Sequence, residues 1–105
     1  MKNYITVYTT VSSTEEAKKI SCGLVETKLA YCVNTIPSIQ STYLWDGKLC
    51  VDDELLLIIK TKEEKFLMLK DWILKNHSYD IPEVIALPIV KGSSGYLKCI
   101  DDWVG

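Results

Sequence analysis

Three side chains that commonly bind metals could meet in the folded chain. Cys32 supplies a thiol, His77 is the one histidine, and Glu83 follows His77 closely. Thiolate and imidazole ligands together suit Cu(I) or Zn²⁺, so these residues form a candidate metal site. The competing interpretations are structural: a small buried thiol on a strand, and an imidazole that ends a helix and binds backbone.

Carboxylates and a lysine form a second candidate group. Glu54 lies in an otherwise apolar stretch, and Lys60 and Glu83 could join it in a polar pocket between subunits. Alternatively, the three residues form ion pairs that fix the register of an interface, which is the interpretation we favour.

Aromatic side chains form the third group. Tyr43 and Trp45 could stack on a flat ligand, although aromatic residues near a hairpin tip more often anchor an interface. Tyr79 is also predicted to lie at the interface or in the pocket.

A single long β-hairpin is predicted to position most of these residues. It covers residues 31–61 and turns at Asp46-Gly47, a dipeptide suited to positive φ angles. An arm at ~3.3 Å per residue is close to ~50 Å long, whereas a compact domain of this size is only ~33 Å across. The apolar tip then needs a partner, most simply another copy of the chain. Counting outward from the turn predicts the pairs Trp45–Lys48, Tyr43–Cys50, Ser41–Asp52 and Ile39–Glu54.

Hydrophobic periodicity predicts the other elements. Their order is that of an α+β fold: a ferredoxin-like βαββαβ protomer with an appended C-terminal helix, forming one domain over 1–105. Prolines at 37 and 88 imply a bulge, a bend or an edge strand. The predicted elements are a strand over 2–10, a helix from a Ser13/Glu16 capping box to about Leu29, a helix from a Thr61/Glu64 capping box to about Asn76, a strand over 83–90, and a short helix over 96–104.

Composition excludes several classes of function. The chain has 12 basic residues, all lysine, against 14 acidic ones, for a net charge of −2. Without a basic patch, a nucleic-acid partner is not expected. Without arginine, the chain has no bidentate group for phosphate, which disfavours phosphoryl chemistry. A lysine-based phosphate site is still compatible with the composition.

The cellular location is also predicted from composition. No stretch is long enough to span a bilayer, and residues 1–10 do not resemble a signal peptide, so no membrane partner and a cytoplasmic location are expected. Four dispersed cysteines are expected to be free thiols.

From residue 30 onward, the sequence resembles the CutA family of divalent-cation tolerance proteins, and the resemblance covers nearly all of the chain. The order and spacing of the matching pieces carry it, since none is specific alone. The pieces are Ala30, Cys32-Val33-Asn34, Pro37, Ser41, Tyr43-Leu44-Trp45-Asp46-Gly47, Glu54, Lys60-Thr61, His77, Tyr79, Pro82-Glu83, Pro88-Ile89, Gly92 and Tyr96-Leu97.

The resemblance implies a homotrimer of the kind formed by PII signalling proteins, with the hairpins knitting the subunits together. It also implies a role in the response to metal ions, with possible binding of copper or another divalent cation. Since the family has no established catalytic reaction, the resemblance implies a protein that is not an enzyme. Assigned copper ligands in the family are a thiol and two histidines. The matching positions here are Thr9, Asn76 and His77, so one ligand of the three is retained.

An alternative to a direct metal role is a PII-like, ligand-sensing or scaffold trimer. A sensor of that kind is expected to gain thermal stability from a small anion or nucleotide.

Overall fold

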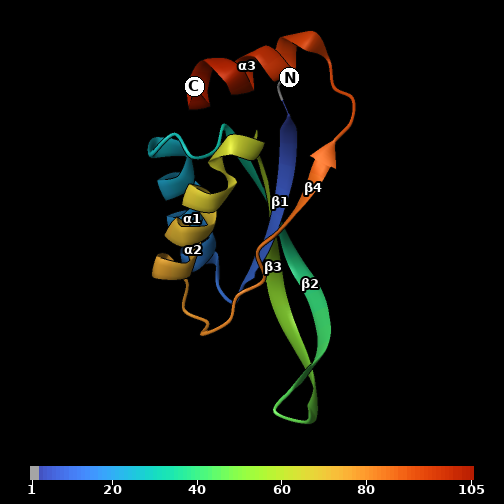
Figure 1. The fold of residues 1–105 in the computed structure, drawn as a ribbon. Coiled ribbons are helices and arrows are strands. Elements are labelled where there is room, and N and C mark those ends of the chain that lie inside the picture. The colour runs from blue at the N-terminus through green and yellow to red at the C-terminus, as the bar shows by residue number, and fades with distance from the viewer. Residues whose placement is uncertain (1–2) are drawn as a thin grey trace.

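The computed structural model describes residues 3–105. It is a four-stranded antiparallel sheet in the order β2-β3-β1-β4, with α1 and α2 together on one face and α3 across one end (Figure 1). This arrangement confirms the predicted α+β, βαββαβ order with a C-terminal helix. The elements are β1 (Tyr4–Val11), α1 (Thr14–Glu26), β2 (Cys32–Trp45), β3 (Lys48–Lys62), a 3-10 turn (Glu63–Lys65), α2 (Phe66–Asn76), β4 (Ile85–Ile89) and α3 (Ser94–Val104).

The β2–β3 hairpin has the predicted turn and register. Asp46 and Gly47 have φ angles of 53° and 73°, the left-handed conformation that the dipeptide predicted. All four predicted cross-strand pairs are present, from Trp45 with Lys48 to Ile39 with Glu54. The arms contain 14 and 15 residues, and the hairpin extends well beyond the helices, giving the chain a longest dimension of 44 Å.

A β-bulge interrupts the hairpin between Ile36 and Ile39. Pro37 lies within it, at a position where the sequence predicted a bulge, a bend or an edge strand. Ser38 has a φ of 60°, which bends the strand locally. The bulge lies on β2, an edge strand, where a missing backbone N–H is tolerated. Pairing resumes on the far side of the bulge, so the hairpin continues past the body of the chain.

The core lies between the helices and one face of the sheet. Alternate residues of β1 and β3 point into it, including Val7 and Leu57, because strand side chains alternate between faces. The facing helices contribute residues at helical spacing, such as Ile20 and Leu24 of α1. Ser13 caps α1 as predicted, accepting a hydrogen bond of 3.1 Å from the Glu16 backbone N–H.

Several predicted boundaries differ from the structure. The first strand, predicted over 2–10, covers Tyr4–Val11, and residue 2 lies outside the described residues. The last helix, predicted over 96–104, begins at Ser94. Thr61 is not a helix cap: β3 continues to Lys62, and the Thr61 hydroxyl donates to the Leu29 carbonyl at 2.7 Å. The 3-10 turn follows, so α2 begins only at Phe66. The helix α1 ends at Glu26, because Lys28 takes a φ of 62°. The fourth strand is limited to Ile85–Ile89, with its proline on the predicted edge strand.

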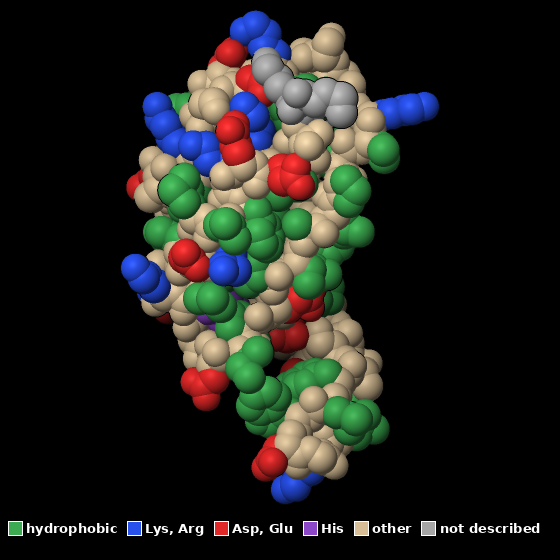
Figure 2. Space-filling model, in the orientation of Figure 1, with side chains coloured by type: hydrophobic (Ala, Val, Ile, Leu, Met, Phe, Trp, Pro, Cys, Tyr) green, Lys and Arg blue, Asp and Glu red, His purple; other side chains and the backbone are tan. Residues whose placement is uncertain are grey.

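Two apolar surfaces have no cover within residues 3–105. One is the sheet face opposite α1 and α2, where Ile36, Ile85 and Leu87 are exposed. The other is the hairpin tip, where Leu44 is 71% exposed and Trp45 is 53% exposed. Figure 2 shows hydrophobic side chains on the hairpin as well as across the middle of the body. Exposed apolar surfaces of this kind are typical of chains that associate.

We predict opposite effects of alanine at two helical glycines. A Cβ at Gly23 of α1 would lie 2.4 Å from ring atoms of Trp72 in α2, so G23A should lower stability by about 1–3 kcal/mol through overpacking. A Cβ at Gly95 of α3 meets nothing within 4 Å, so G95A should raise stability by up to about 1 kcal/mol through reduced chain entropy. Urea unfolding of both variants tests this, and equal effects would contradict the packing of α1 on α2.

Candidate functional site

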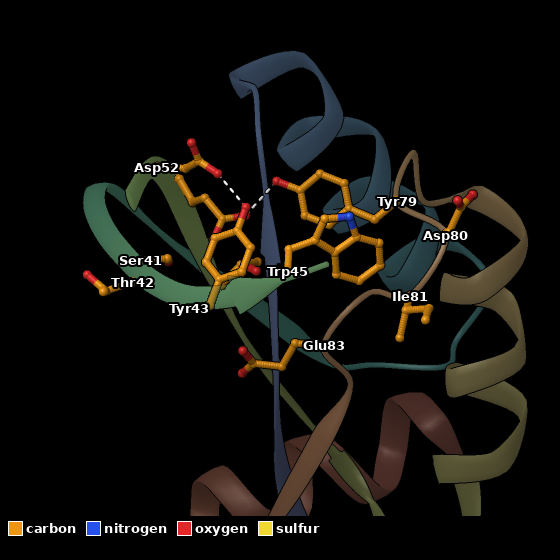
Figure 3. Close-up of a pocket in the computed structure, with 11 residues that line it drawn as sticks. Ser41, Thr42, Tyr43, Trp45, Asp52, Tyr79, Asp80, Ile81 and Glu83 are labelled. Carbon is orange, nitrogen blue, oxygen red and sulfur yellow. Dashed lines mark hydrogen bonds between the residues drawn. The ribbon is translucent and has the colours of Figure 1, made fainter. Parts of the chain in front are cut away.

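A pocket of about 580 Å³ lies where the hairpin leaves the body of the chain. Its walls come from three segments: the middle of the hairpin, the end of β1, and the loop between α2 and β4 (Figure 3). Five predicted site residues line this one pocket, namely Tyr43, Trp45, Glu54, Tyr79 and Glu83. The other lining residues are Thr10, Ser41, Thr42, Asp52, Asp80 and Ile81.

Glu54 and Tyr79 form the hydrogen bond at the base of the pocket. Glu54 is only 7% exposed, and its Oε2 accepts a hydrogen bond of 2.5 Å from the Tyr79 hydroxyl. Burial, and then the hydrogen bond and negative charge of Glu54, strongly raise the pKa of Tyr79. The phenol therefore stays protonated at neutral pH and acts as a donor.

A similar pair lies further along the hairpin. The hydroxyl of Tyr43 on β2 donates to a carboxylate oxygen of Asp52 on β3, as the dashed line in Figure 3 marks. This hydrogen bond, with a smaller contribution from lost hydration, raises the pKa of Tyr43 to about 12. The two strands thus each contribute one member of a second phenol–carboxylate pair.

Glu83 reaches the pocket from the segment before β4, opposite the aromatic rings in Figure 3. Partial loss of hydration, followed by repulsion from the Glu54 charge, raises the pKa of Glu83. A carboxylate near another carboxylate is harder to ionise, so the pocket favours any positive charge that enters it.

His77 is buried beside the pocket, and both of its ring nitrogens have partners. Its Nε2 lies 2.7 Å from the Thr10 carbonyl oxygen, which identifies that nitrogen as the donor. Its Nδ1 accepts a hydrogen bond of 3.1 Å from the Tyr79 backbone N–H. The ring also packs against that of Tyr79, with centroids 4.7 Å apart. In this arrangement His77 positions Tyr79 and offers no free nitrogen to a metal.

Cys32 lies elsewhere in the sheet. It pairs with Lys60, which in turn pairs with Thr6, whereas His77 binds the carbonyl of Thr10 at the other end of β1. Within residues 3–105, no three His, Cys, Asp or Glu side chains are grouped so that they could hold a metal ion. The metal set of Cys32, His77 and Glu83 therefore stays a prediction.

Lys60 does not line the pocket with Glu54 and Glu83. Its ammonium group donates to the Asn34 side chain across the strand pair, on the uncovered face of the sheet. Six residues along one strand separate it from Glu54 by ~20 Å. A role for Lys60 at an interface on that face is still open, but a shared pocket with Glu54 within one chain is not formed.

Sequence and structure comparisons agree on the relationship of this chain. A family model described as "CutA1 divalent ion tolerance protein" matches residues 5–103. The chain belongs to this family. The "Divalent-cation tolerance protein CutA" of Thermus thermophilus is 44% identical over 98 residues, covering 93% of this CutA chain and 91% of the relative.

Solved CutA structures have the same fold. The "Divalent cation tolerance protein (Cut A1)" of Thermus thermophilus superposes with a TM-score of 0.94 at 41% identity, covering 97% of this chain and 99% of that one. The "Periplasmic divalent cation tolerance protein CutA" of Archaeoglobus fulgidus gives a TM-score of 0.92 at 42% identity, with full coverage of both.

Plant relatives are longer. "Protein CutA, chloroplastic" of Arabidopsis thaliana is 50% identical over 94 residues, which are 90% of this chain but 52% of the relative. This CutA chain thus spans about half the length of the plant proteins it matches. The names of these bacterial, archaeal and plant relatives refer to cation tolerance or to CutA, and none refers to a reaction. Among residues 3–105, no helix is both long and apolar enough to cross a bilayer.

Sequence reasoning missed the residue that holds the His77 loop in place. The sequence pattern accounts for Glu16 only as half of a capping box, but its carboxylate accepts hydrogen bonds from the Ser78 backbone N–H at 2.7 Å and the Ser78 hydroxyl at 3.0 Å. Burial acts to raise the pKa of Glu16, but these hydrogen bonds and the neighbouring imidazole outweigh it, so the pKa is lowered. The sequence separation of 62 residues gives no local signal for this contact.

We predict that E16Q destabilises the CutA chain in a pH-dependent way. Because the folded-state pKa of Glu16 lies below its ordinary value of 4.5, its stabilisation is present above that pH and is lost as the pH falls through the folded-state value. At pH 7, E16Q should cost about 1–2 kcal/mol by removing charge-assisted hydrogen bonds.

The matched control is E15Q, which removes an exposed carboxylate from the same first helical turn and so matches the helix-dipole effect. Urea unfolding at pH 7 and at pH 3.5 should show the difference between the two variants shrinking at the lower pH. A difference that persists unchanged in acid would contradict the role assigned to the Glu16 carboxylate.

Proposed function

We propose that this CutA chain is a homotrimeric divalent-cation tolerance protein that acts in the cellular response to metal ions without catalysing a reaction. The observation that carries this proposal is the family relationship, since a relative named for divalent-cation tolerance is 44% identical across nearly the full length of both chains. The structure supports the same assignment through a fold shared with CutA proteins of several organisms.

Self-association is supported by the surfaces that the single chain leaves uncovered. The hairpin tip and the open sheet face together present exposed or half-buried Leu, Ile, Val, Tyr and Trp side chains to water. Burying such surface stabilises an assembly by about 25 cal/mol per Å² of apolar area. A closed ring of three subunits, as in PII proteins, would cover both surfaces with one repeated contact.

A cytoplasmic location is the proposed setting. All four cysteines are free, which suits a reducing compartment. Relatives are named for other compartments, chloroplastic in Arabidopsis thaliana and periplasmic in Archaeoglobus fulgidus. Because relatives are named for different compartments, the cytoplasmic location is proposed for this chain and not for the family.

Any copper binding by one chain is proposed to be weak and carried mainly by His77. A dedicated copper site gathers several ligands, and the described residues do not form one. To bind copper, the imidazole must give up its contact with the Thr10 carbonyl or with the Tyr79 N–H. The energy of the lost hydrogen bond then lowers the affinity for the metal.

A ligand-sensing trimer is the second candidate, and the pocket favours it. The pocket joins the hairpin to the body, so a molecule bound there would contact both. Its lining includes four carboxylate residues, Asp52, Glu54, Asp80 and Glu83, which argues against the small anion or nucleotide expected from the PII comparison.

We predict a trimer in solution. Light scattering at micromolar protein should give about three times the chain mass of 11.9 kDa. L44D, at the hairpin tip, should weaken the assembly, whereas L67D, at a position of α2 with similar exposure of 67% against 71%, should leave it intact. A monomeric parent, or equal loss in both variants, would refute the proposed interface.

We also predict weak copper binding that depends on His77. Calorimetric titration of copper into the protein should show weak uptake that H77A abolishes and C32S leaves unchanged, because Cys32 lies away from His77. Tight binding lost in both variants would establish a Cys/His site instead. Unchanged binding in both would place the metal elsewhere.

A further inference from the structure

The pocket at the base of the hairpin has an unbalanced charge. Four of its lining residues carry carboxylates, and no lysine is among the lining residues of the described chain. In Figure 2, acidic side chains are visible in the hollow between the body and the hairpin. Asp80 points away from the aromatic rings in Figure 3, so Asp52, Glu54 and Glu83 determine the charge inside.

Glu54 is the residue that most requires a positive partner. It is 7% exposed, and its one hydrogen bond comes from the neutral hydroxyl of Tyr79. No basic side chain of residues 3–105 lies within ion-pair distance of it. A buried carboxylate without a cation loses its hydration and gains little in return. The nearby carboxylate of Glu83 adds repulsion.

Aromatic rings form the other wall of the pocket. Tyr43, Trp45 and Tyr79 all line it, and Figure 3 shows their rings on the side opposite Glu83. The faces of aromatic rings attract cations, most strongly those of ammonium type with bound carbon groups. Hard metal ions instead need several oxygen ligands at once, and the described residues gather no such set. The combination favours an organic cation over a metal ion.

We propose that this pocket binds the ammonium group of a small free amine. The ammonium N–H groups donate to the carboxylates of Glu54 and Glu83, while the rings of Tyr43 and Trp45 pack on the adjoining carbon chain. Asp52, already bonded to Tyr43, lies within the same pocket and suits the second ammonium of a diamine. This assignment goes beyond metal tolerance and does not depend on copper binding.

Calorimetry with putrescine tests the proposal. The parent protein should bind the diamine in equimolar ratio to chains, and 1,4-butanediol, a neutral molecule of the same length, should not bind. E54Q should weaken binding by roughly tenfold or more, because a charge-assisted hydrogen bond is lost. E83Q should weaken it similarly, and it tests the same point if E54Q fails to fold, since Glu83 lies near the surface.

The matched control is D53N. Asp53 is the neighbour of Glu54 on β3, is exposed and does not line the pocket, so this variant makes the same charge change outside the site. Its putrescine affinity should equal that of the parent. Equal weakening by D53N and E54Q, or binding of butanediol, would overturn the proposal, as would absence of putrescine binding.

Two further measurements separate the amine from other cations. Carbodiimide cross-linking followed by mass spectrometry would reveal a lysine of a second chain held against Glu54; such a cross-link in the parent would overturn the free-amine assignment. Calcium or magnesium that displaces putrescine from the parent at lower concentration, and whose own calorimetric binding is lost in E54Q, would identify a metal site instead. If neither calcium nor magnesium displaces putrescine, the result supports the amine assignment.

Discussion

Continuous pairing of β2 with β3 is the constraint on which the rest of this structure depends. The two strands satisfy each other's backbone groups as far as the Asp46-Gly47 turn, well past the last helix that could cover their side chains. The bulge before Ile39 allows this pairing to continue. Backbone hydrogen bonding thus extends an element that side-chain packing within one chain cannot cover, and both the exposed tip and the pocket follow from it.

The loop after α2 ties that extended hairpin to the body. Glu16 binds Ser78, His77 bridges Thr10 and Tyr79, and Tyr79 donates to Glu54 on the hairpin. Each link joins segments that are distant in sequence, so the pocket forms only in the folded chain. This explains why a buried histidine next to a candidate site has a positioning role: its two nitrogens are used to direct the phenol of Tyr79.

Features with local causes could be predicted from the sequence, and features decided by distant partners could not. The hairpin register followed from its turn as far as the bulge, because a two-residue loop fixes the pairs from Trp45–Lys48 to Ile39–Glu54; beyond the bulge the register shifts by one residue. The helix cap predicted at Thr61 does not form, because Thr61 pairs with β1 as part of β3 and its hydroxyl donates to the Leu29 carbonyl. Five of the eleven residues that line the pocket are among those predicted from the sequence as interface, pocket or metal candidates. Lys60 does not line the pocket of the single chain, because strand spacing places it away from Glu54, and its role at an interface stays a prediction.

Trp45 connects the two unexplained surfaces of the chain. It lines the acidic pocket and is also 53% exposed on the apolar tip that we expect another subunit to cover. Assembly would therefore fix one wall of the pocket, and a ligand that orders Trp45 would prepare the tip for assembly. Linkage requires the two effects to be equal in free energy. In the proposed assembly, occupancy of the proposed amine pocket and association of the subunits would thus be coupled through this one side chain.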